Sequence, residues 1–409
     1  MNKIGIEKLN IYAGIASIGV AELLAGRGLE VERIDNIQQD RRSVGLGFED
    51  PVTNAVNAAK PIIDAIGDAA EQIEMVIISS ESGIDYSKSL ASYVHKHLNL
   101  STKCRFLEVK QACYAATGAL QMALGYLYSG MSPGAKILII ATDITLVDER
   151  AEYAEPSTGF GAAAILLGEN AEILQIDKGA FGIHSYEIMD SARPTSAADI
   201  VDVDKSLFAF LDCYSNSFSH YQNRVEGADF LNSFGGLAMH TPFAGLVKAA
   251  HRKIMREQVD QCGAELIEAD FERRLGPSLY YPKQVGNLCS GSLYLALASM
   301  IDHRKGEEAM RVGLFSYGSG CSSEFYSGIV NGTSRASLKE FDIAGRLEKR
   351  TSLDFSQYDA LLKDNLQAII PFENREICLQ DYETYMPPER PPLFALRKIS
   401  DYYRHYEWI

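Results

Sequence analysis

Gln111-Ala-Cys-Tyr-Ala-Ala-Thr117 joins an apolar run, residues 104–109, to a helical pattern, residues 118–128. This order predicts a buried strand that turns directly into a helix, as in α/β proteins. The positive end of the helix would lie near Cys113, which favours the thiolate and suits it to attack a thioester. Cysteine is also among the most buried residue types, so packing is the alternative for any of the seven cysteines. The turn in which it lies makes Cys113 the candidate nucleophile.

The alternation of strands and helices extends through the chain. Strands are predicted at residues 75–80, 136–143, 162–167 and 312–315, and helices at residues 52–66, 207–224, 245–257 and 290–301. Polar residues 190–205 predict a loop near the junction of two halves, and residues 316–320 a glycine-rich turn. Within the charged tail, residues 383–392 are predicted to form an ordered surface loop. We therefore predict an α/β fold with halves at residues 1–175 and 176–409.

Composition excludes several classes of protein. With 409 residues, 46% hydrophobic and 23% charged, the chain is typical of a soluble globular protein with two large cores. It shows neither a signal peptide nor an apolar run of about 18 residues, so we expect a cytoplasmic protein without membrane contact. A net charge of −15 disfavours nucleic acid as a partner. The odd cysteine number and the lack of zinc-type spacing predict reduced thiols and no metal.

Three further segments carry candidate groups. Ser79-Ser-Glu-Ser-Gly-Ile-Asp85 places Glu81 at the end of a buried strand, where partial desolvation would raise its pKa and suit it to proton abstraction. A solvated strand-end carboxylate is the alternative. Ala238-Met-His-Thr-Pro-Phe243 contains His240, which taken alone is more often a core histidine. Val285-Gly-Asn-Leu288 offers the Asn287 amide, and Ser316-Tyr-Gly-Ser-Gly320 offers backbone N–H groups for an acyl oxygen, although either segment can be a simple turn.

The chain order of Cys113, His240 and Asn287 resembles that of thiolase-like condensing enzymes. This order alone also fits a ketoacyl synthase. With Glu81 included, the sequence resembles the 3-hydroxy-3-methylglutaryl-CoA synthase family along nearly its whole length. The matching segments are Asn57-Ala-Ala-Lys60, Glu81, Ala112-Cys-Tyr114, Ala141-Thr-Asp-Ile144, Glu155-Pro-Ser157, Asp190 with Arg193-Pro194, His240-Thr-Pro-Phe243, Gly286-Asn287, Gly291-Ser-Leu-Tyr294 and Phe315-Ser-Tyr-Gly-Ser-Gly320.

The resemblance implies a thiolase-like fold, with two duplicated α/β halves in an αβαβα layered arrangement, and a homodimer. It implies that Cys113 takes up an acetyl group and Glu81 removes a methyl proton, so that the enolate attacks the ketone of a β-ketoacyl thioester. His240 would polarise that ketone, and water would then cleave the enzyme thioester. The substrate-binding residues that the resemblance implies are Ser157, Asn287, Ser316, Tyr317 and Lys248.

Departures from the family pattern indicate the substrate. Members that use CoA usually carry lysines five and nine positions after the histidine, where this chain has Gly245 and Ala249. The segments around Glu81, Cys113 and His240 are more similar to the synthases of polyketide β-branching cassettes, whose substrates are carried by a donor and an acceptor acyl carrier protein. No cofactor beyond the phosphopantetheine of those thioesters is implied. Basic candidates for carrier-protein docking are Arg33, Arg252, Arg41, Arg42 and Lys253.

Ala115 and Ala116 stand where the family more often has glycine or serine, so we expect a reshaped acyl pocket, with propionyl as an alternative to acetyl. Three other functions remain open at this point. A CoA-dependent hydroxymethylglutaryl-CoA synthase is the alternative within the family, and a ketoacyl synthase would leave its product as a thioester. A non-catalytic docking module would need none of Glu81, Cys113, His240 and Asn287.

Overall fold

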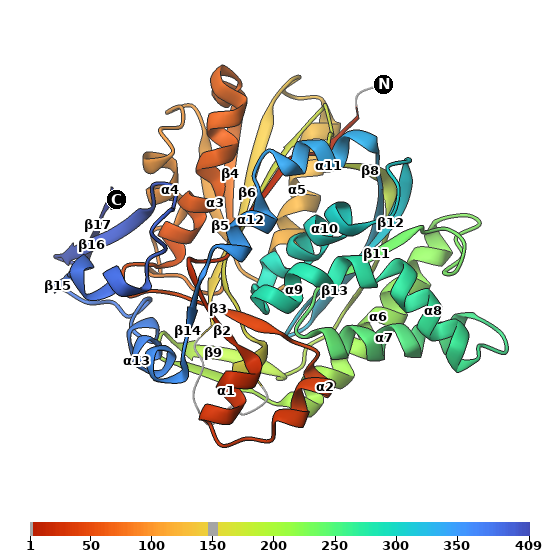
Figure 1. Cartoon of the computed structure of the whole chain (residues 1–409). Helices are drawn as coiled ribbons and strands as arrows, with labels where there is room; N and C mark the ends of the chain where they lie inside the picture. Colours follow the sequence, from red (N-terminus) through yellow and green to blue (C-terminus); the bar gives the residue numbers. More distant parts are fainter. Residues whose placement is uncertain (1–2, 146–153) are drawn as a thin grey trace.

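The computed structural model describes residues 3–145 and 154–409 (Figure 1). Among these residues the largest sheet has nine strands, in the order β11-β12-β13-β8-β1-β7-β6-β4-β5. Their bounds are β1 Gly5–Tyr12, β4 Ile73–Ser79, β5 Arg105–Val109, β6 Lys136–Ile144, β7 Phe160–Gly168, β8 Leu174–Ser185, β11 Gly236–Met239, β12 Met310–Gly318 and β13 Ser322–Val330.

Strands of the two halves of the chain repeat one pairing pattern. In the first half, β1 is antiparallel to β7, β7 is antiparallel to β6, and β6 is parallel to β4. In the second half, β8 is antiparallel to β13, β13 is antiparallel to β12, and β12 is parallel to β11. The two sets meet where Gly5 and Ile6 of β1 pair with Gln175 and Leu174 of β8. The predicted α/β class is confirmed, and the predicted boundary after residue 175 falls inside β8.

Helices of both halves of the chain pack against this sheet. They are α1 Val20–Gly26, α2 Ile34–Ile37, α3 Pro51–Ile66, α4 Ala91–His97, α5 Ala115–Ser129, α6 Val203–Arg224, α7 Ala244–Gln258, α8 Ala264–Arg274, α9 Tyr280–Val285, α10 Ser292–His303, α11 Gly332–Lys339, α12 Ile343–Glu348 and α13 Phe355–Asn365. In α10, all residues from Ser292 to Ile301 are buried, as expected for an interior helix that is apolar all round. Helices α6, α7 and α8 lie together at one side of the molecule, in green in Figure 1.

The end of the chain returns to the first half. β14 Thr351–Leu353 pairs with β2 Ala16–Gly19, which also pairs with β3 Arg41–Val44. β15 Arg375–Glu376, β16 Phe394–Ser400 and β17 Tyr403–Trp408 form a small sheet that contacts α3. The predicted surface loop at residues 383–392 begins in a short 3₁₀ helix, Leu379–Tyr385. None of the helices in the described part of the chain is long and apolar enough to cross a membrane.

Two of the predicted loops are wrong. Residues 190–205, predicted as a loop, contain the hairpin of β9 Ser191–Thr195 and β10 Ala198–Val201 and the first turn of α6. The two strands pair through their backbones, and an ion pair between Arg193 and Asp199 also joins them. Ile200 and Val201 of β10 are exposed, so no buried apolar pattern marks the hairpin. Residues 316–318, predicted as part of a turn, are the end of β12 and pair with β13.

Candidate active site

A cavity of about 800 Å³ lies between the two halves of the chain. Glu81 and Cys113 reach it from the first half, and His240, Asn287 and Tyr317 reach it from the second. Its volume lies in the range of small-molecule sites. The structure therefore brings the three predicted catalytic residues and three of the five predicted substrate-binding residues, including Ser157, to one cavity.

Cys113 lies in a tight turn between β5 and α5. Ala112 has a φ of 43°, a backbone conformation that is uncommon outside glycine. Gly318 at the end of β12 packs against this turn, since a Cβ built on Gly318 would lie 2.4 Å from the Tyr114 nitrogen. Only glycine therefore allows β12 to approach the Cys113 turn so closely.

The protonation state of Cys113 differs from the sequence-based expectation. A hydrogen bond with the Cys289 thiol lowers the pKa of Cys113, but burial and the charges of Glu81 and Asp143 outweigh it, so that the pKa is raised. Cys113 directly precedes Tyr114, the N-cap of α5, so it lies at the predicted strand-to-helix turn. The raised pKa means that the expected thiolate does not predominate in the resting site.

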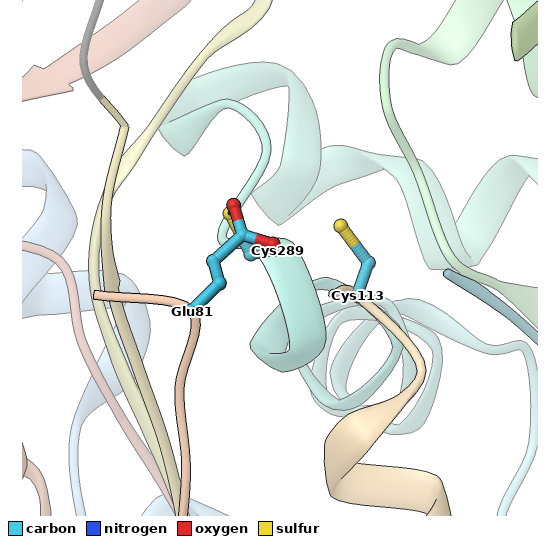
Figure 2. A group of neighbouring side chains, drawn as sticks. All are labelled: Glu81, Cys113 and Cys289. Carbon is cyan, nitrogen blue, oxygen red and sulfur yellow. The ribbon is translucent and has the colours of Figure 1, made fainter. Parts of the chain in front are cut away.

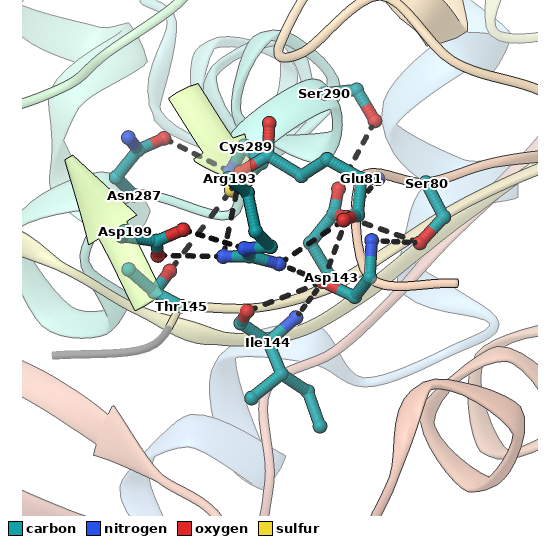
Figure 3. A network of polar contacts seen from close by, with 11 residues as sticks. Ser80, Glu81, Asp143, Ile144, Thr145, Arg193, Asp199, Asn287, Cys289 and Ser290 are labelled. Atoms are coloured by element: carbon teal, nitrogen blue, oxygen red, sulfur yellow. Dashed lines mark hydrogen bonds and ion pairs between the residues drawn. The ribbon is translucent and has the colours of Figure 1, made fainter. Parts of the chain in front are cut away.

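Glu81 follows β4 and is held through its backbone (Figure 3). Its N–H group donates to Asp143 Oδ1 at 2.7 Å, and its carbonyl oxygen accepts from Arg193 at 3.2 Å. Asp143, at 3% exposure, also accepts hydrogen bonds from the hydroxyls of Ser80 and Ser82, at 3.1 and 3.2 Å. This network fixes the direction of the carboxylate that faces the cavity.

Two carboxyl groups that lie this close affect each other's protonation. Burial raises the pKa of Glu81, opposed by the positive charge of Arg193. Burial and the charge of Glu81 also raise the pKa of Asp143 well above its ordinary value. A raised pKa is what the sequence analysis expected of a carboxylate that removes a proton, and its cause is the expected desolvation.

Arg193 is a site residue to which the sequence analysis gave no role, although Arg193-Pro194 is among the matching segments. Its Nε and Nη2 atoms donate to Asp199 at 2.6 and 2.7 Å, and Nη1 donates to the Ser82 hydroxyl at 2.8 Å. Its Nη2 lies 3.7 Å from Glu81 Oε1. Arg193 therefore supplies the positive charge beside the candidate base.

His240 follows β11 and is 2% exposed. Burial lowers the pKa of His240 to about 3, against the effect of its hydrogen bond to the Cys289 backbone. The ring is therefore neutral at physiological pH. Its Nδ1 atom has no hydrogen-bond partner among the described residues. Because the hydrogen bond to the Cys289 backbone raises the pKa, the ring N–H group donates it, and Nδ1 of the neutral ring keeps a lone pair that can only accept a hydrogen bond.

Asn287 and Ser157 meet at the seam between the two halves. The Asn287 N–H group donates to the Ser157 carbonyl at 2.8 Å. A Cβ on Gly286 would lie 2.3 Å from the Thr158 oxygen, and Gly286 has a φ of 91°. Asn287 Oδ1 accepts from the Cys289 N–H at 3.0 Å and from the Ser292 hydroxyl at 2.7 Å. These two hydrogen bonds orient the Asn287 side chain from residues that follow it in the chain.

Of the other predicted substrate-binding residues, one lines the cavity and two do not. Tyr317 lines the cavity, and its hydroxyl donates to Asp190 at 2.7 Å. Ser316 does not line the cavity and is 1% exposed within β12. Lys248 lies on α7 outside the lining and pairs with Glu268 at 2.6 Å. The Gly320 N–H group, considered for an acyl oxygen, donates to Asp190 at 2.9 Å.

Ala115 and Ala116 are buried in the first turn of α5 and do not line the cavity. Their methyl groups therefore do not narrow it directly, contrary to the expectation of a reshaped acyl pocket.

The predicted docking residues occupy different environments. Arg33 precedes α2, and Asn36 of that helix lines the cavity. Arg252 is exposed on α7, whereas Lys253 on the same helix pairs with Glu257 at 2.6 Å. Arg41 donates to the hydroxyls of Ser17 and Ser352. Arg42 is 4% exposed and donates to the Glu155 carbonyl, so it cannot meet a partner protein and its selection was wrong.

Cys289 is the second residue to which the sequence analysis gave no role. Its sulfur lies 3.6 Å from Glu81 Oε1, and one ligand atom each of Glu81, Cys113 and Cys289 lie within 4.8 Å of one another (Figure 2). Two sulfurs and a carboxylate oxygen are also a donor set that suits a soft divalent cation such as zinc. The only signal in the sequence is the position of Cys289, two residues after Asn287.

Comparisons with known proteins agree with this geometry. Residues 2–172 match the family model described as hydroxymethylglutaryl-coenzyme A synthase N terminal, and residues 253–405 match the model of its C terminal. The polyketide biosynthesis 3-hydroxy-3-methylglutaryl-ACP synthase PksG of Bacillus subtilis (strain 168) is 44% identical, over 99% of each chain. The hydroxymethylglutaryl-CoA synthase of Enterococcus faecalis is 32% identical, over 90% of this chain and 93% of its own.

A solved structure shows the same fold. The curacin biosynthetic pathway HMG synthase in complex with acetyl donor-ACP is 43% identical, with a TM-score of 0.96 over 99% of this chain and 100% of its own. The thiolase-like fold implied by the sequence is thereby confirmed. Two matching domain models and a nearly full-length relative at 44% identity place this chain in the hydroxymethylglutaryl-CoA synthase family.

Proposed function

We propose that the protein is the condensing enzyme of a polyketide β-branching cassette. It takes acetyl from a donor acyl carrier protein and adds it to a β-ketoacyl group on an acceptor acyl carrier protein. Hydrolysis from the enzyme then gives a 3-hydroxy-3-methylglutaryl-type intermediate. The observation that carries this proposal is the meeting of a thiol, a carboxylate of raised pKa and a neutral histidine, Cys113, Glu81 and His240, in one cavity.

Each group has one task in the reaction. The Cys113 sulfur forms a thioester with acetyl, and the pantetheine thiol leaves. Glu81 then takes a methyl proton, and the resulting enolate carbon bonds to the ketone carbon of the acceptor. His240 lies beside the ketone and orients it, and the ketone oxygen becomes a hydroxyl by taking the proton that Glu81 removed. Water cleaves the Cys113 thioester to a carboxylate, so the chemistry needs no cofactor beyond the phosphopantetheine arms.

The residues at the start of α7 favour a carrier protein over CoA as the acyl donor. A Cβ on Gly245 would lie 1.8 Å from the Asn36 oxygen, so the backbone of α2 occupies the space that a lysine would need there. Ala249 is exposed but carries no charge, and Lys248 is paired with Glu268. The cations that CoA-dependent members use for the CoA phosphates therefore have no counterparts at these two positions. The name of the relative PksG and the donor-ACP complex of the curacin enzyme point the same way.

Exposed apolar side chains beside the cavity support a protein partner. Val201 and Val203 line the cavity at 48% and 42% exposure, and Ile200 and Phe208 nearby are 52% and 72% exposed. Apolar groups at the rim of a site suit contact with a protein surface more than with a nucleotide. Arg33 and Arg252 are the proposed basic contacts for an acidic carrier protein.

The deciding experiment is intact-protein mass spectrometry after separate incubation with acetyl-carrier protein and with acetyl-CoA. We expect rapid addition of one acetyl group from the carrier protein, slow addition from acetyl-CoA, and none in Cys113→Ala. Equal or faster loading from acetyl-CoA would favour the CoA-dependent enzyme. Loading from neither donor would favour a docking module, and a propionyl-carrier protein in parallel tests the choice of acyl group.

We also propose that the protein works as a homodimer in the cytoplasm. β5 is the edge of the nine-stranded sheet and lies next to the nucleophile helix α5. Phe106 on this edge strand is 45% exposed. An exposed strand edge with an aromatic side chain is a surface that proteins usually cover, here by the same strand of a second copy.

A further inference from the structure

A second cavity, separate from the catalytic one, lies where the end of the chain packs against the first half. Its volume is about 480 Å³, and no described residue lines both cavities. Its wall is formed by the end of β1, by α3 and α12, and by residues 387–393 together with Trp408 on β17. This volume lies in the range of small-molecule sites, and the proposed reaction gives the cavity no task.

Much of this wall is apolar. The buried side chains of Tyr12, Ile15 and Leu393 line the cavity, and the Tyr12 hydroxyl is engaged because it donates to Glu49. Trp408 also lines the cavity and is 42% exposed. Most contacts of a bound molecule would therefore be apolar, as in other small-molecule sites.

Two arginines of this wall carry a positive charge that no carboxylate balances. Arg350 is 7% exposed and donates to neutral acceptors, such as the Ser43 hydroxyl and the Gln284 carbonyl, at 2.8 and 2.7 Å. Arg346 donates through Nη2 to the Asn10 side chain, and its buried Nε atom has no hydrogen-bond partner among the described residues. In the part of the chain that the structure describes, neither arginine forms an ion pair with an Asp or Glu side chain. Charged groups are rarely buried without such a partner, so these two side chains favour an anion in the cavity.

The other charged groups at the cavity leave these two charges unbalanced. Lys60 and Asp64 line the cavity and pair with each other. Lys349 and Glu389, one of each sign, both lie at exposed positions of the rim. Asp342 caps the start of α12 and does not line the cavity. The cavity is therefore basic, in a chain whose net charge is −15.

We propose that this cavity binds a small organic acid with an apolar chain, whose carboxylate pairs with Arg346 and whose chain packs against Trp408. Nη1 of Arg346 is the atom left for the ligand, because Nη2 is already bonded and Nε is buried. A hydrogen bond between a guanidinium and a carboxylate is about twice as strong as one between neutral groups. Arg350 supports the anion through its charge, and Arg390, which lines the same cavity, donates to the main-chain oxygen of Ile409 at 3.3 Å. The inference goes beyond the proposed function and does not depend on it.

Octanoate is the probe, with octan-1-ol and acetate as controls that lack the charge and the chain, respectively. Isothermal titration calorimetry of the full chain measures the affinity. The fluorescence of Trp408, the single tryptophan of the sequence, reports whether the ligand reaches this cavity. We expect saturable binding of octanoate with a parallel change in Trp408 emission. Octan-1-ol and acetate should bind at least about tenfold more weakly, the usual effect of losing a charged hydrogen bond or an apolar chain.

Arg346→Gln removes the charge and keeps a side chain that can bond to Asn10. We expect it to weaken octanoate binding by about tenfold and to leave octan-1-ol binding unchanged. Arg256→Gln, at an exposed position of α7, is the matched control and should bind octanoate like the unaltered protein. Should Arg346→Gln not fold, Lys349→Glu at the exposed rim decides, because a negative charge there should weaken octanoate binding several-fold.

Undiminished octanoate binding in Arg346→Gln, or in Lys349→Glu where the first variant does not fold, would overturn the proposal. Equal affinity for octan-1-ol would do the same, because the site would then rest on apolar contact alone. Absence of binding, or binding without a response of Trp408, would also overturn it.

Octanoate could reach the catalytic cavity instead, and protein alkylated at Cys113 by iodoacetamide tests this. We expect its affinity for octanoate to equal that of the unmodified protein, whereas loss of binding would place octanoate in the catalytic cavity and overturn the proposal. These measurements use no acyl thioester, so their outcome and that of the acetyl-loading experiment are independent.

Discussion

Glu81 and Cys113 influence each other through charge, although their tasks in the reaction are separate. The carboxylate is one of the groups that raise the pKa of Cys113, and the same carboxylate has a raised pKa because it is buried. The site therefore has to balance a nucleophile that ionises against a base that stays available. Arg193 and Cys289 both contact Glu81 and set this balance.

Replacing Glu81 by glutamine should separate the two stages of the reaction. Glu81→Gln removes a negative charge beside Cys113, so we expect acetyl loading at least as fast as in the unaltered protein. Condensation should fall by about 10²–10⁴-fold, the usual contribution of a general base. Intact mass spectrometry measures the first stage and product analysis the second. Loss of loading in this variant would contradict the division of tasks.

Glu324 predicts how stability depends on pH. Burial raises its pKa to about 7, and it accepts hydrogen bonds from Tyr114 and Gln121. Because the folded protein then binds a proton more tightly than the unfolded chain, this group stabilises the fold below about pH 4.5 and loses that contribution as pH rises through 7. The loss is roughly 3 kcal/mol.

Chemical denaturation at about pH 5 and pH 8 tests this sign. Glu324→Gln should lessen the fall in unfolding free energy between the two pH values by that amount. The exposed residue Glu376 provides the control, Glu376→Gln, which should keep the full fall. A decline that persists unchanged in Glu324→Gln would show that Glu324 is ionised throughout. Burial also raises the pKa of Glu49 to about 7. Glu49 therefore makes its own contribution to the fall in unfolding free energy in every variant.

Among the elements, the contact between α2 and α7 is the one that bears on substrate choice. Gly245→Lys should destabilise the fold by about 1–3 kcal/mol, because its Cβ would meet the Asn36 backbone oxygen. It should leave acetyl-CoA a poor donor. Ala249→Lys, at an exposed position of the same helix, is the matched control and should change stability by less than about 0.5 kcal/mol. Thermal denaturation and loading from acetyl-CoA measure both effects, and a stable, CoA-using Gly245→Lys would refute the packing argument.

Elements buried on both faces were the ones that the sequence predicted well. β4, β6 and β7 are almost continuously buried, so the central part of each sequence is an apolar run. The hairpin of β9 and β10 was missed because Ile200 and Val201 of β10 are exposed, so no buried apolar pattern marks it. Residues 316–318 were assigned to a glycine-rich turn, whereas they end β12, and Gly318 allows this strand to pass beside Cys113.

For the site, residue types in chain order selected Glu81, Cys113 and His240, and the structure places all three at one cavity. Cys289 and Arg193 were missed because their roles depend on distances across the fold. Ser316 was expected at the substrate, but the alternation of side chains along β12 turns it away from the cavity that Tyr317 lines. Neighbours in sequence can thus face opposite sides of a strand.

At the scale of the whole molecule, the sheet has an open edge at β5. Phe106→Asp on this edge should convert the proposed dimer into a monomer, because a charge would be buried in the contact. Leu266→Asp on α8, at 44% exposure and away from β5, is the control and should leave the dimer intact. Sedimentation velocity distinguishes the two states. A dimeric Phe106→Asp would place the contact elsewhere, and a monomeric unaltered protein would exclude the dimer.

The Glu81–Cys289 contact has a consequence for the nascent chain, because 208 residues separate its two partners. A ribosome that adds about 5–20 residues per second needs roughly 10–40 s between them. During that interval the first half has emerged with its base and its nucleophile, while the residues that complete the cavity have yet to be made. The newly synthesised thiol is then open to oxidants and electrophiles, so the speed of translation through the second half sets how long the unfinished enzyme is exposed to damage.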